Sequence, residues 1–361
     1  MNDRRYACTL CGVLYEVTAG RIVCDCGGPL RLVADFAVLP ENLYGRPFGL
    51  TRYMEAIALD ESALMACDLG MSMSPLLPME ESIFVKCDYR LPSGSFKDRG
   101  AAALVALAIE LGETKLVVDS SGNAAAALSA HAARAGLNVT VVVPTGAPEG
   151  KLVQIRAYGS DVEIAPGTRA DAGRLARKIV SEVGGLYASH GQNPFFLEGT
   201  KTWAFEVWEQ LGECPATVVM PVGSGSLLLG VHAGFSYLRR IGRCSEIPRL
   251  VAVQSRGWAA LTGDLSRADG PTPLTDGIAI ANPFRKQEIL DAVAESGGAV
   301  VVVDDEDVIG AYGRLAMSGI WVEPTAAAAW AALERLPDNW PPGPIVVNLG
   351  GAGYKKPIAS S

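Results

Sequence analysis

Short apolar runs alternate with longer amphipathic segments over most of this chain. The short runs are rich in Val and Ile and predict buried strands, whereas the longer segments place apolar residues three and four positions apart and predict helices. Strands alternating with helices are typical of parallel sheets covered by helices on both faces. We expect strands at 83–87, 115–119, 139–144, 161–165, 217–222, 250–254, 300–303 and 345–349.

The same pattern predicts helices at 101–111, 123–135, 150–158, 169–183, 198–211, 226–240, 305–318 and 325–336. Residues 31–82 show little periodicity and predict a loop-rich lead-in with short helices. The expected fold class is α/β, with two doubly wound domains, a cofactor cleft between them and a small zinc-ribbon-like segment in front. The expected limits are 1–35 for the Cys-rich segment, 36–110 with 200–361 for the larger domain, and 111–199 for the smaller one.

Composition narrows the function classes. The chain has 361 residues, 49% of them apolar, and a net charge of −8 without any basic run, which disfavours nucleic-acid and anionic-membrane partners. No apolar stretch approaches the roughly 18 residues that a membrane span needs. The first residues do not resemble a signal peptide, so we expect a cytoplasmic protein with reduced thiols.

Four of the eight cysteines cluster near the N-terminus, as Cys8-x2-Cys11 and Cys24-x-Cys26. Thiolates from two such turns are typical of a small zinc ribbon, although the second pair is one residue shorter than usual. Two interpretations stay open, a bound Zn²⁺ or a knuckle that keeps its thiols without metal. The other four cysteines are scattered and predict buried packing residues: Cys67, Cys87, Cys214 and Cys244.

The segment 91–100 carries the first candidate chemistry. Pro92 and Gly94 break the preceding strand, and Ser95 with Asp98 three residues later predicts a capping box at the start of the following helix. Lys97 would then lie in the first helical turn, where the helix dipole disfavours an ammonium and favours the free amine. Such a lysine can form a Schiff base with a carbonyl. The alternative is an ordinary exposed lysine.

A Gly/Ser loop, 223–226, joins the strand at 217–222 to a helix. Unhindered backbone amides at a helix start favour a phosphate group. The loop lacks the Lys-Ser/Thr of a nucleotide P-loop, and Leu228 and Gln254 replace the third Gly and the acidic residue of a dinucleotide motif. An ordinary tight turn is the alternative.

A third loop, 119–124, also lies where a strand meets a helix. Its small hydroxyl side chains and amides suit a carboxylate, and Asn123 offers an amide to a phenolate-like oxygen. An N-cap cluster is the alternative. Together, an imine-forming amine, a phosphate loop without nucleotide features and an amide near a ring oxygen suit pyridoxal phosphate.

With these motifs the chain resembles the tryptophan-synthase-β-like, or fold type II, pyridoxal-phosphate enzymes, and within them threonine synthase and its relatives. The resemblance covers nearly the whole chain and includes the Cys-rich head. It is carried by several segments in the same order: 93–100, 120–123, 193–202, 221–227, 322–325 and 349–355.

The resemblance implies that Lys97 holds the cofactor as a Schiff base and moves protons at the substrate. It further implies that Asn123 contacts the ring hydroxyl of the cofactor. Cofactor contacts are expected from Lys97, Phe96, Asn123, Gly223, Ser224, Gly225, Ser226, Leu227 and Gly350, substrate contacts from Ser120, Ser121, Gly122, Ala124 and His190, and metal contacts from Cys8, Cys11, Cys24 and Cys26.

Three positions depart from the family pattern. Threonine synthases usually have an Arg where this chain has Phe196, and that Arg helps to hold the phosphate of O-phosphohomoserine. A Thr is common where Ala124 stands, and a hydroxyl residue usually faces the pyridine nitrogen where Gly350 stands. The changes at Phe196 and Ala124 argue against O-phosphohomoserine as the substrate. His190, just before the 193–202 motif, is either an acid/base or substrate contact or a surface-loop imidazole.

The predicted function is that of a pyridoxal-phosphate-dependent lyase or synthase that eliminates or replaces a Cβ or Cγ leaving group on a small amino acid. The alternatives are a cysteate-synthase-like β-replacement and a serine/threonine dehydratase. A catalytically idle protein with this fold is a further alternative, and a nicotinamide-dependent oxidoreductase is disfavoured by Leu228 and Gln254. We expect a homodimer because relatives often are dimers.

Overall fold

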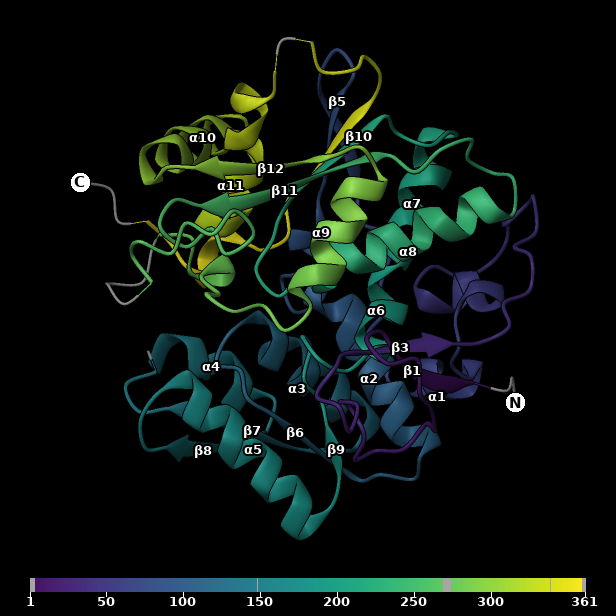
Figure 1. Cartoon of the computed structure of the whole chain (residues 1–361), viewed down its shortest axis with the longest axis vertical. Coiled ribbons are helices and arrows are strands. Elements are labelled where there is room, and N and C mark those ends of the chain that lie inside the picture. Colours follow the sequence, from purple (N-terminus) through teal and green to yellow (C-terminus); the bar gives the residue numbers. More distant parts are fainter. Residues whose placement is uncertain (1–3, 148, 269–273, 338, 359–361) are drawn as a thin grey trace. The chain divides into compact units, whose positions relative to one another are not determined.

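The computed structural model describes residues 4–147, 149–268, 274–337 and 339–358. The chain forms two compact units. Unit 1 comprises the chain up to Ser72 together with Lys97–Thr200, and unit 2 comprises Met73–Phe96 together with the chain from Lys201 onward. The elements of both are labelled in Figure 1. These boundaries differ from the domain limits expected at 35, 110 and 199, which remain a prediction.

Unit 2 is built on a six-stranded sheet in the order β12-β11-β10-β13-β5-β4. The five strands from β12 to β5 are parallel, and β4 adds to the edge in antiparallel orientation. Their apolar sequences follow from burial on both faces. The strands are β4 (Leu76–Glu80), β5 (Ile83–Lys86), β10 (Thr217–Pro221), β11 (Arg249–Ser255), β12 (Ala299–Val303) and β13 (Ile345–Asn348).

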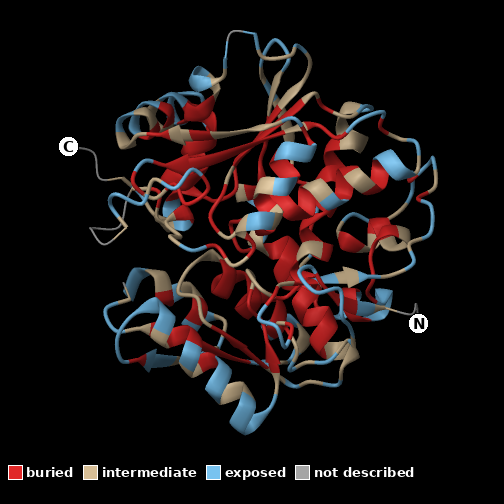
Figure 2. Ribbon diagram, in the orientation of Figure 1, coloured by how far each residue is buried: buried red, intermediate tan, exposed pale blue. Residues whose placement is uncertain are grey.

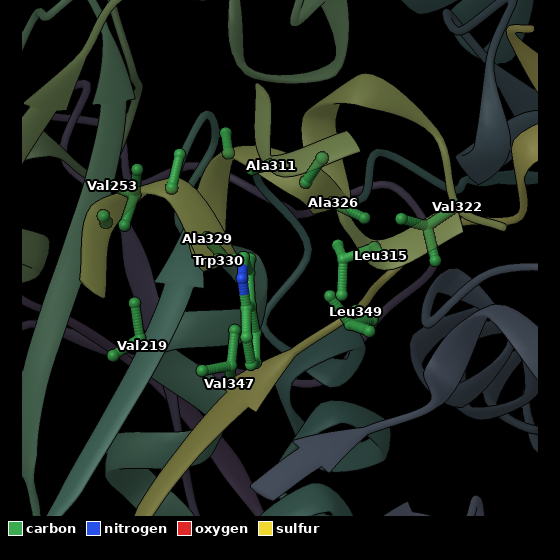
Figure 3. Close-up of a cluster of buried hydrophobic side chains, with 14 of the residues drawn as sticks. Val219, Val253, Ala311, Leu315, Val322, Ala326, Ala329, Trp330, Val347 and Leu349 are labelled. Atoms are coloured by element: carbon green, nitrogen blue, oxygen red, sulfur yellow. The ribbon is translucent and has the colours of Figure 1, made fainter. Parts of the chain in front are cut away.

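The helices of unit 2 pack on this sheet. Strands β10, β11 and β13 form one buried core with α10 and α11, to which Trp330, Leu315, Val219 and Val347 belong (Figure 3). The helices are α7 (Thr202–Leu211), α8 (Ser226–Arg240), α9 (Lys286–Glu295), α10 (Asp305–Met317) and α11 (Pro324–Ala331), with 3₁₀ helices at Asp88–Arg90, Asp276–Ile278, Ala332–Arg335 and Gly353–Lys355.

Unit 1 contains a four-stranded parallel sheet in the order β8-β7-β6-β9. Helix α5 buries Ala172 and Ala176 against it, while its outer face is exposed (Figure 2). The strands are β6 (Lys115–Val118), β7 (Asn138–Pro144), β8 (Asp161–Ala165) and β9 (Leu186–Tyr187). The helices are α1 (Glu61–Ala66), α2 (Lys97–Glu110), α3 (Asn123–Ala135), α4 (Glu149–Ala157), α5 (Arg169–Val183) and α6 (Phe195–Thr200), with a 3₁₀ helix at Leu50–Ala56.

The Cys-rich head belongs to unit 1 and forms a three-stranded antiparallel sheet of β1 (Arg5–Cys8), β2 (Leu14–Glu16) and β3 (Leu30–Val33). It is attached to the helices of this unit through β1. Arg4 forms an ion pair with Glu110 of α2, and the ring of Tyr6 lies 6.0 Å from the ring of Phe195 in α6, in an edge-on arrangement. Among the described residues, no helix combines the length and the apolar character needed to cross a bilayer.

The predicted α/β fold is confirmed, and α3, α5 and α8 have the predicted bounds. The predicted helix 198–211 is wrong in detail, because two helices meet at Lys201. The expectations of four scattered packing cysteines and of reduced thiols are also partly wrong. Cys67 and Cys87 are buried thiols, but Cys214 and Cys244 form a disulfide with a Cα–Cα distance of 5.8 Å. Their loops precede the paired strands β10 and β11, which brings them together.

Candidate active site

The residues that lead to Lys97 are held against the end of β13 within unit 2. The Phe96 amide donates to the Gly350 carbonyl (2.9 Å), Ser95 forms an antiparallel bridge with Gly351, and the Ala352 amide donates to the Gly94 carbonyl (3.0 Å). Lys97 follows as the first residue of α2. The lysine is therefore in the first helical turn, as predicted, and the residue before it is fixed at the carboxyl edge of the sheet.

The predicted capping box of Ser95 and Asp98 is wrong. Because α2 begins at Lys97, Ser95 lies two residues before the helix, and its backbone forms a β-bridge with Gly351. The Ser95 hydroxyl is fully buried and has no hydrogen-bond partner among the described residues. The carboxylate of Asp98 instead lies 3.3 Å from Nε2 of His131 in α3.

The Gly/Ser loop lies at the same edge of the sheet in unit 2. Strands β10 and β13 are parallel and paired, so Gly223, which follows β10, lies on the edge where Phe96 meets Gly350. Gly225 has a φ of +79°, and a Cβ there would lie 2.3 Å from Cδ1 of Ile289. Only glycine fits this position, since both the backbone angle and the space exclude a side chain. Helix α8 then starts at Ser226 and directs its first amides toward the loop.

The sequence did not reveal which segment lies against Gly223. A Cβ on Gly223 would be 3.0 Å from Cα of Ile278 and 3.1 Å from the Gly277 carbonyl oxygen. The Gly277 amide in turn donates to the Thr325 hydroxyl (3.3 Å). The 3₁₀ turn at Asp276–Ile278 thus closes one side of the loop, and its sequence carries no motif by which pattern reasoning would find it.

The loop 119–124 follows β6 in unit 1. Helix α3 begins at Asn123, and the Ser120 hydroxyl accepts a hydrogen bond from the Gly122 amide (3.3 Å). Ser120, Ser121 and Gly122 are half-buried, whereas Ala124 is buried. The loop therefore presents a helix start with small side chains, which is the arrangement that suits a carboxylate group.

Lys97 lies beside an aromatic side chain in unit 1. Its Nζ is 5.5 Å from the ring centroid of Phe196, and the ring of His190 is 6.0 Å from the same ring. Helices α2 and α6 approach closely because Gly100 and Gly199 lie between them: a Cβ on Gly100 would be 2.4 Å from the Phe196 ring. The structure thus brings the predicted residues Lys97 and His190 together.

Burial, and to a smaller degree the charges of Lys97 and Arg169, hold the pKa of His190 well below its ordinary value. The imidazole is consequently neutral near pH 7. Elsewhere in unit 1, the Asp119 carboxylate at the end of β6 accepts a hydrogen bond from the Tyr187 hydroxyl (2.7 Å), and burial raises the pKa of Asp119.

The four cysteines of the head converge. The sulfur atoms of Cys8, Cys11, Cys24 and Cys26 all lie within 4.8 Å of one another. The Tyr15 hydroxyl lies 3.1 Å from Cys24 Sγ, and this hydrogen bond is the largest cause that lowers the pKa of Cys24 to about 6. The short second pair, Cys24-x-Cys26, thus does not prevent the four side chains from meeting.

A family model described as pyridoxal-phosphate dependent enzyme matches residues 69–351. The chain belongs to this family. Threonine synthase from Methanocaldococcus jannaschii is 33% identical over 351 residues, with 91% of this chain and 86% of the relative covered. Threonine synthase from Synechocystis is 36% identical over 278 residues, with 76% and 72% covered.

Among solved structures, an L-serine ammonia-lyase from the fungus Rhizomucor miehei matches with a TM-score of 0.67 and 25% identity, covering 80% of this chain and 99% of that one. The resemblance stated from the sequence is confirmed. The protein is a threonine synthase-like, fold type II pyridoxal-phosphate enzyme, and its predicted class as a pyridoxal-phosphate-dependent lyase is confirmed.

The residues of unit 2 fit this cofactor. Helix α8 begins directly after the Gly/Ser loop and offers its free amides there, which suits a phosphate, and the buried Ser95 hydroxyl, on the segment that enters Lys97, has no hydrogen-bond partner among the described residues. Gly350 lies under Phe96, since a Cβ there would be 2.9 Å from the Phe96 ring. This contact leaves no room for a side chain at position 350.

Proposed function

We propose that Lys97 is the residue that binds pyridoxal phosphate covalently and moves the proton at Cα of an amino-acid substrate. When bound, the cofactor withdraws electrons from Cα and makes that proton acidic. The observation that carries the proposal is the anchoring of Phe96 to Gly350 at the sheet edge where Gly223 begins the turn into α8. This anchoring holds the residue before Lys97 at the edge of the unit 2 sheet where the loop into α8 begins.

The positions of the other residues in the fold suggest which part of the cofactor or substrate each would contact. Amides and hydroxyls of Gly223, Ser224, Gly225, Ser226 and Leu227 would hold the phosphate, because they lead into and begin a 15-residue helix whose dipole favours an anion. Phe96 and Gly350 would contact the cofactor ring, and Asn123 would donate to its ring oxygen. The loop formed by Ser120, Ser121, Gly122 and Ala124 binds the substrate carboxylate, and His190 contacts the substrate side chain.

The enzyme acts on a small amino acid and eliminates or replaces a group at Cβ or Cγ. Product analysis separates the alternatives, because a dehydratase releases a keto acid and ammonia from the amino acid alone, whereas a replacement reaction requires an added nucleophile. We further propose that the chain forms a homodimer in the cytoplasm, in line with its relationship to other enzymes of this family.

Lys97→Ala removes the amine that binds the cofactor and moves the proton. We expect loss of the yellow absorbance and a decrease in turnover of at least about 10²–10⁴-fold, the range for a positioned general base. Borohydride reduction followed by peptide mass mapping should find the reduced cofactor adduct on Lys97 in the wild type. Lys178→Ala, on the exposed face of α5, serves as the control and should keep both the colour and the adduct.

We also propose that Cys8, Cys11, Cys24 and Cys26 bind one Zn²⁺. A tetrahedral zinc–thiolate site with Zn–S bonds of about 2.3 Å places its sulfur atoms about 3.8 Å apart. The structure has 3.5 Å between Cys8 and Cys26 and between Cys11 and Cys24. Four converging thiols with these spacings support a closed structural site rather than a catalytic one.

Metal analysis of the purified protein should give about one zinc per chain. Cys11→Ser should lower that ratio, because three thiolates bind zinc more weakly than four. Cys67→Ser, a buried thiol outside the head, is the matched control and should keep the zinc. A wild-type protein without zinc, expressed in zinc-supplemented medium, would contradict the metal site and leave the proposal for Lys97 intact.

A further inference from the structure

The surroundings of Lys97 in unit 1 carry information on the substrate side chain. The Nζ atom faces the ring of Phe196 at 5.5 Å, and the His190 ring meets the same phenyl ring edge-on at 6.0 Å with an interplanar angle of 64°. Lys97, Phe196 and His190 therefore form one cluster, drawn from the start of α2, the start of α6 and the loop after β9.

The Phe196 ring is fixed in this cluster. It is 1% exposed and packs on the backbone of Gly100, where a Cβ would clash with three of its ring atoms. The Phe196 amide donates to the Asn193 carbonyl (3.2 Å), and the Thr200 hydroxyl donates to the Phe196 carbonyl (3.3 Å). The aromatic wall beside Lys97 is thus part of the packed interior and not a side chain that can turn away.

Two polar atoms in the adjoining loop lack partners. Among the described residues, neither Nδ1 of His190 nor Nδ2 of Asn193 has a hydrogen-bond partner, although both atoms are buried and Asn193 is only 1% exposed. Buried polar groups are nearly always hydrogen-bonded, so the loop 190–193 is built to receive a polar ligand atom. The imidazole that offers Nδ1 is neutral and carries no charge to match an anion.

The cluster is unsuited to a phosphate. The face of a phenyl ring carries a partial negative charge, which repels a dianion, and a neutral imidazole provides at most one uncharged hydrogen bond. Arg169, whose charge contributes to the lowered pKa of His190, is solvent-exposed at the start of α5, and water screens that charge. A hydroxyl group has the opposite properties: it is uncharged, both donates and accepts, and its carbon packs against an aromatic ring.

We propose that the side chain of the amino-acid substrate carries an uncharged hydroxyl group, and that Phe196 and His190 select it against a phosphorylated one. The inference rests on the proposed function, because it takes the amine of Lys97 as the place where the substrate is bound. His190 is assigned as the hydrogen-bond partner of the hydroxyl, and Phe196 as the residue that excludes the phosphate.

The test is a titration of the holoenzyme, followed by the absorbance of its bound cofactor, with L-serine, L-threonine and L-homoserine and with the O-phosphate of each. The hydroxy amino acids should perturb the spectrum at concentrations at least about tenfold lower than the phosphates, the effect of one missing charge-assisted pair. A lower half-saturation concentration for the phosphates overturns the inference.

Two variants identify the residues responsible. Phe196→Arg should shift the preference toward the phosphates by about tenfold or more, while Phe196→Leu, which keeps the site uncharged, should not. His190→Phe should remove the preference of the enzyme for serine over alanine, which lacks the hydroxyl. If Phe196→Arg does not fold, the wild-type titrations and the His190→Phe ratio still decide.

The outcomes distinguish a failure of the proposed function from a failure of the proposed selectivity. If no amino acid changes the cofactor spectrum and borohydride yields no adduct on Lys97, the proposed function fails. If the spectrum responds and the adduct forms, but the phosphates are preferred or His190→Phe keeps the serine-to-alanine ratio, only the selectivity assigned here fails.

Discussion

At the scale of single residues, the packing of two aromatic rings requires glycine at two positions. The ring of Phe96 takes up the space that a side chain at Gly350 would need. The ring of Phe196 likewise occupies the space that a side chain at Gly100 would need. Both glycines let an aromatic ring lie close to the backbone, Phe96 in unit 2 and Phe196 in unit 1.

Gly350→Ala tests this packing. The added Cβ would lie 2.9 Å from the Phe96 ring and 3.0 Å from Nδ2 of Asn348, so the free energy of unfolding should decrease by about 1–3 kcal/mol, as is usual for overpacking. Urea denaturation measures the change. Gly313→Ala in α10 is the control, because no atom lies within 4 Å of its added Cβ, and it should stabilise the helix slightly.

A double variant tests whether the ring of Phe96 is the reason for glycine at position 350. Phe96→Leu should relieve much of the loss caused by Gly350→Ala, since the smaller side chain removes the contact. If Gly350→Ala is as stable as the wild type, the ring does not impose glycine at this position.

At the scale of elements, most helices and strands were predictable because their apolar period is clear. The helix at Lys286–Glu295 and the strand at Leu76–Glu80 were not predicted. The strand contains Pro78, which reads as a breaker, and it is tolerated because β4 is an edge strand and needs amides on one side only. Contacts between distant segments, such as Phe196 beside Lys97 or Ile278 beside Gly223, have no local sequence signal.

The start of α10 allows a test of pH dependence. Asp304 precedes the helix and pairs with Arg256 and Arg335, and its amide donates to Asp307 (2.8 Å). The pair with Arg256 is the largest cause that lowers the pKa of Asp304. A carboxyl whose folded pKa is depressed stabilises the fold above its unfolded pKa, and this contribution disappears as the pH falls through the folded pKa.

Asp304→Asn should therefore destabilise the protein at pH 7 by up to about 1 kcal/mol, since the pair is partly exposed, and the difference from the wild type should shrink toward pH 3. Thermal unfolding at several pH values and at two salt concentrations measures it. A difference that is the same at pH 7 and pH 3 would show that the charge of Asp304 contributes nothing.

At the scale of the whole molecule, two compact units share one continuous chain, and each was recognisable as α/β from the sequence. The sequence did not reveal the disulfide between Cys214 and Cys244, because thirty residues, including β10 and α8, separate them. The pairing of β10 with β11 makes the two loops neighbours, and only the topology of unit 2 shows this.

Cys214→Ser should lower the free energy of unfolding. Closing a loop of this length restricts the unfolded chain, which contributes about 3–4 kcal/mol in the chain-entropy model. Urea denaturation of the oxidised wild type and the variant measures the difference, with thiol counting to establish the oxidation state. Equal stability of the two proteins would show that the bridge does not constrain the unfolded chain.

The hydrogen bond from Phe96 to Gly350 makes the segment before Lys97 sensitive to truncation of the chain. The backbone before position 97 is held by residues near 350, much later in the chain, so a nascent chain lacks the partner of the lysine segment until those residues have been translated. A premature stop before position 350, although far from the lysine in sequence, would leave Ser95 and Phe96 without their backbone bonds. The segment that leads into Lys97 thus gains its backbone partners only after β13 and the residues that follow it have been made.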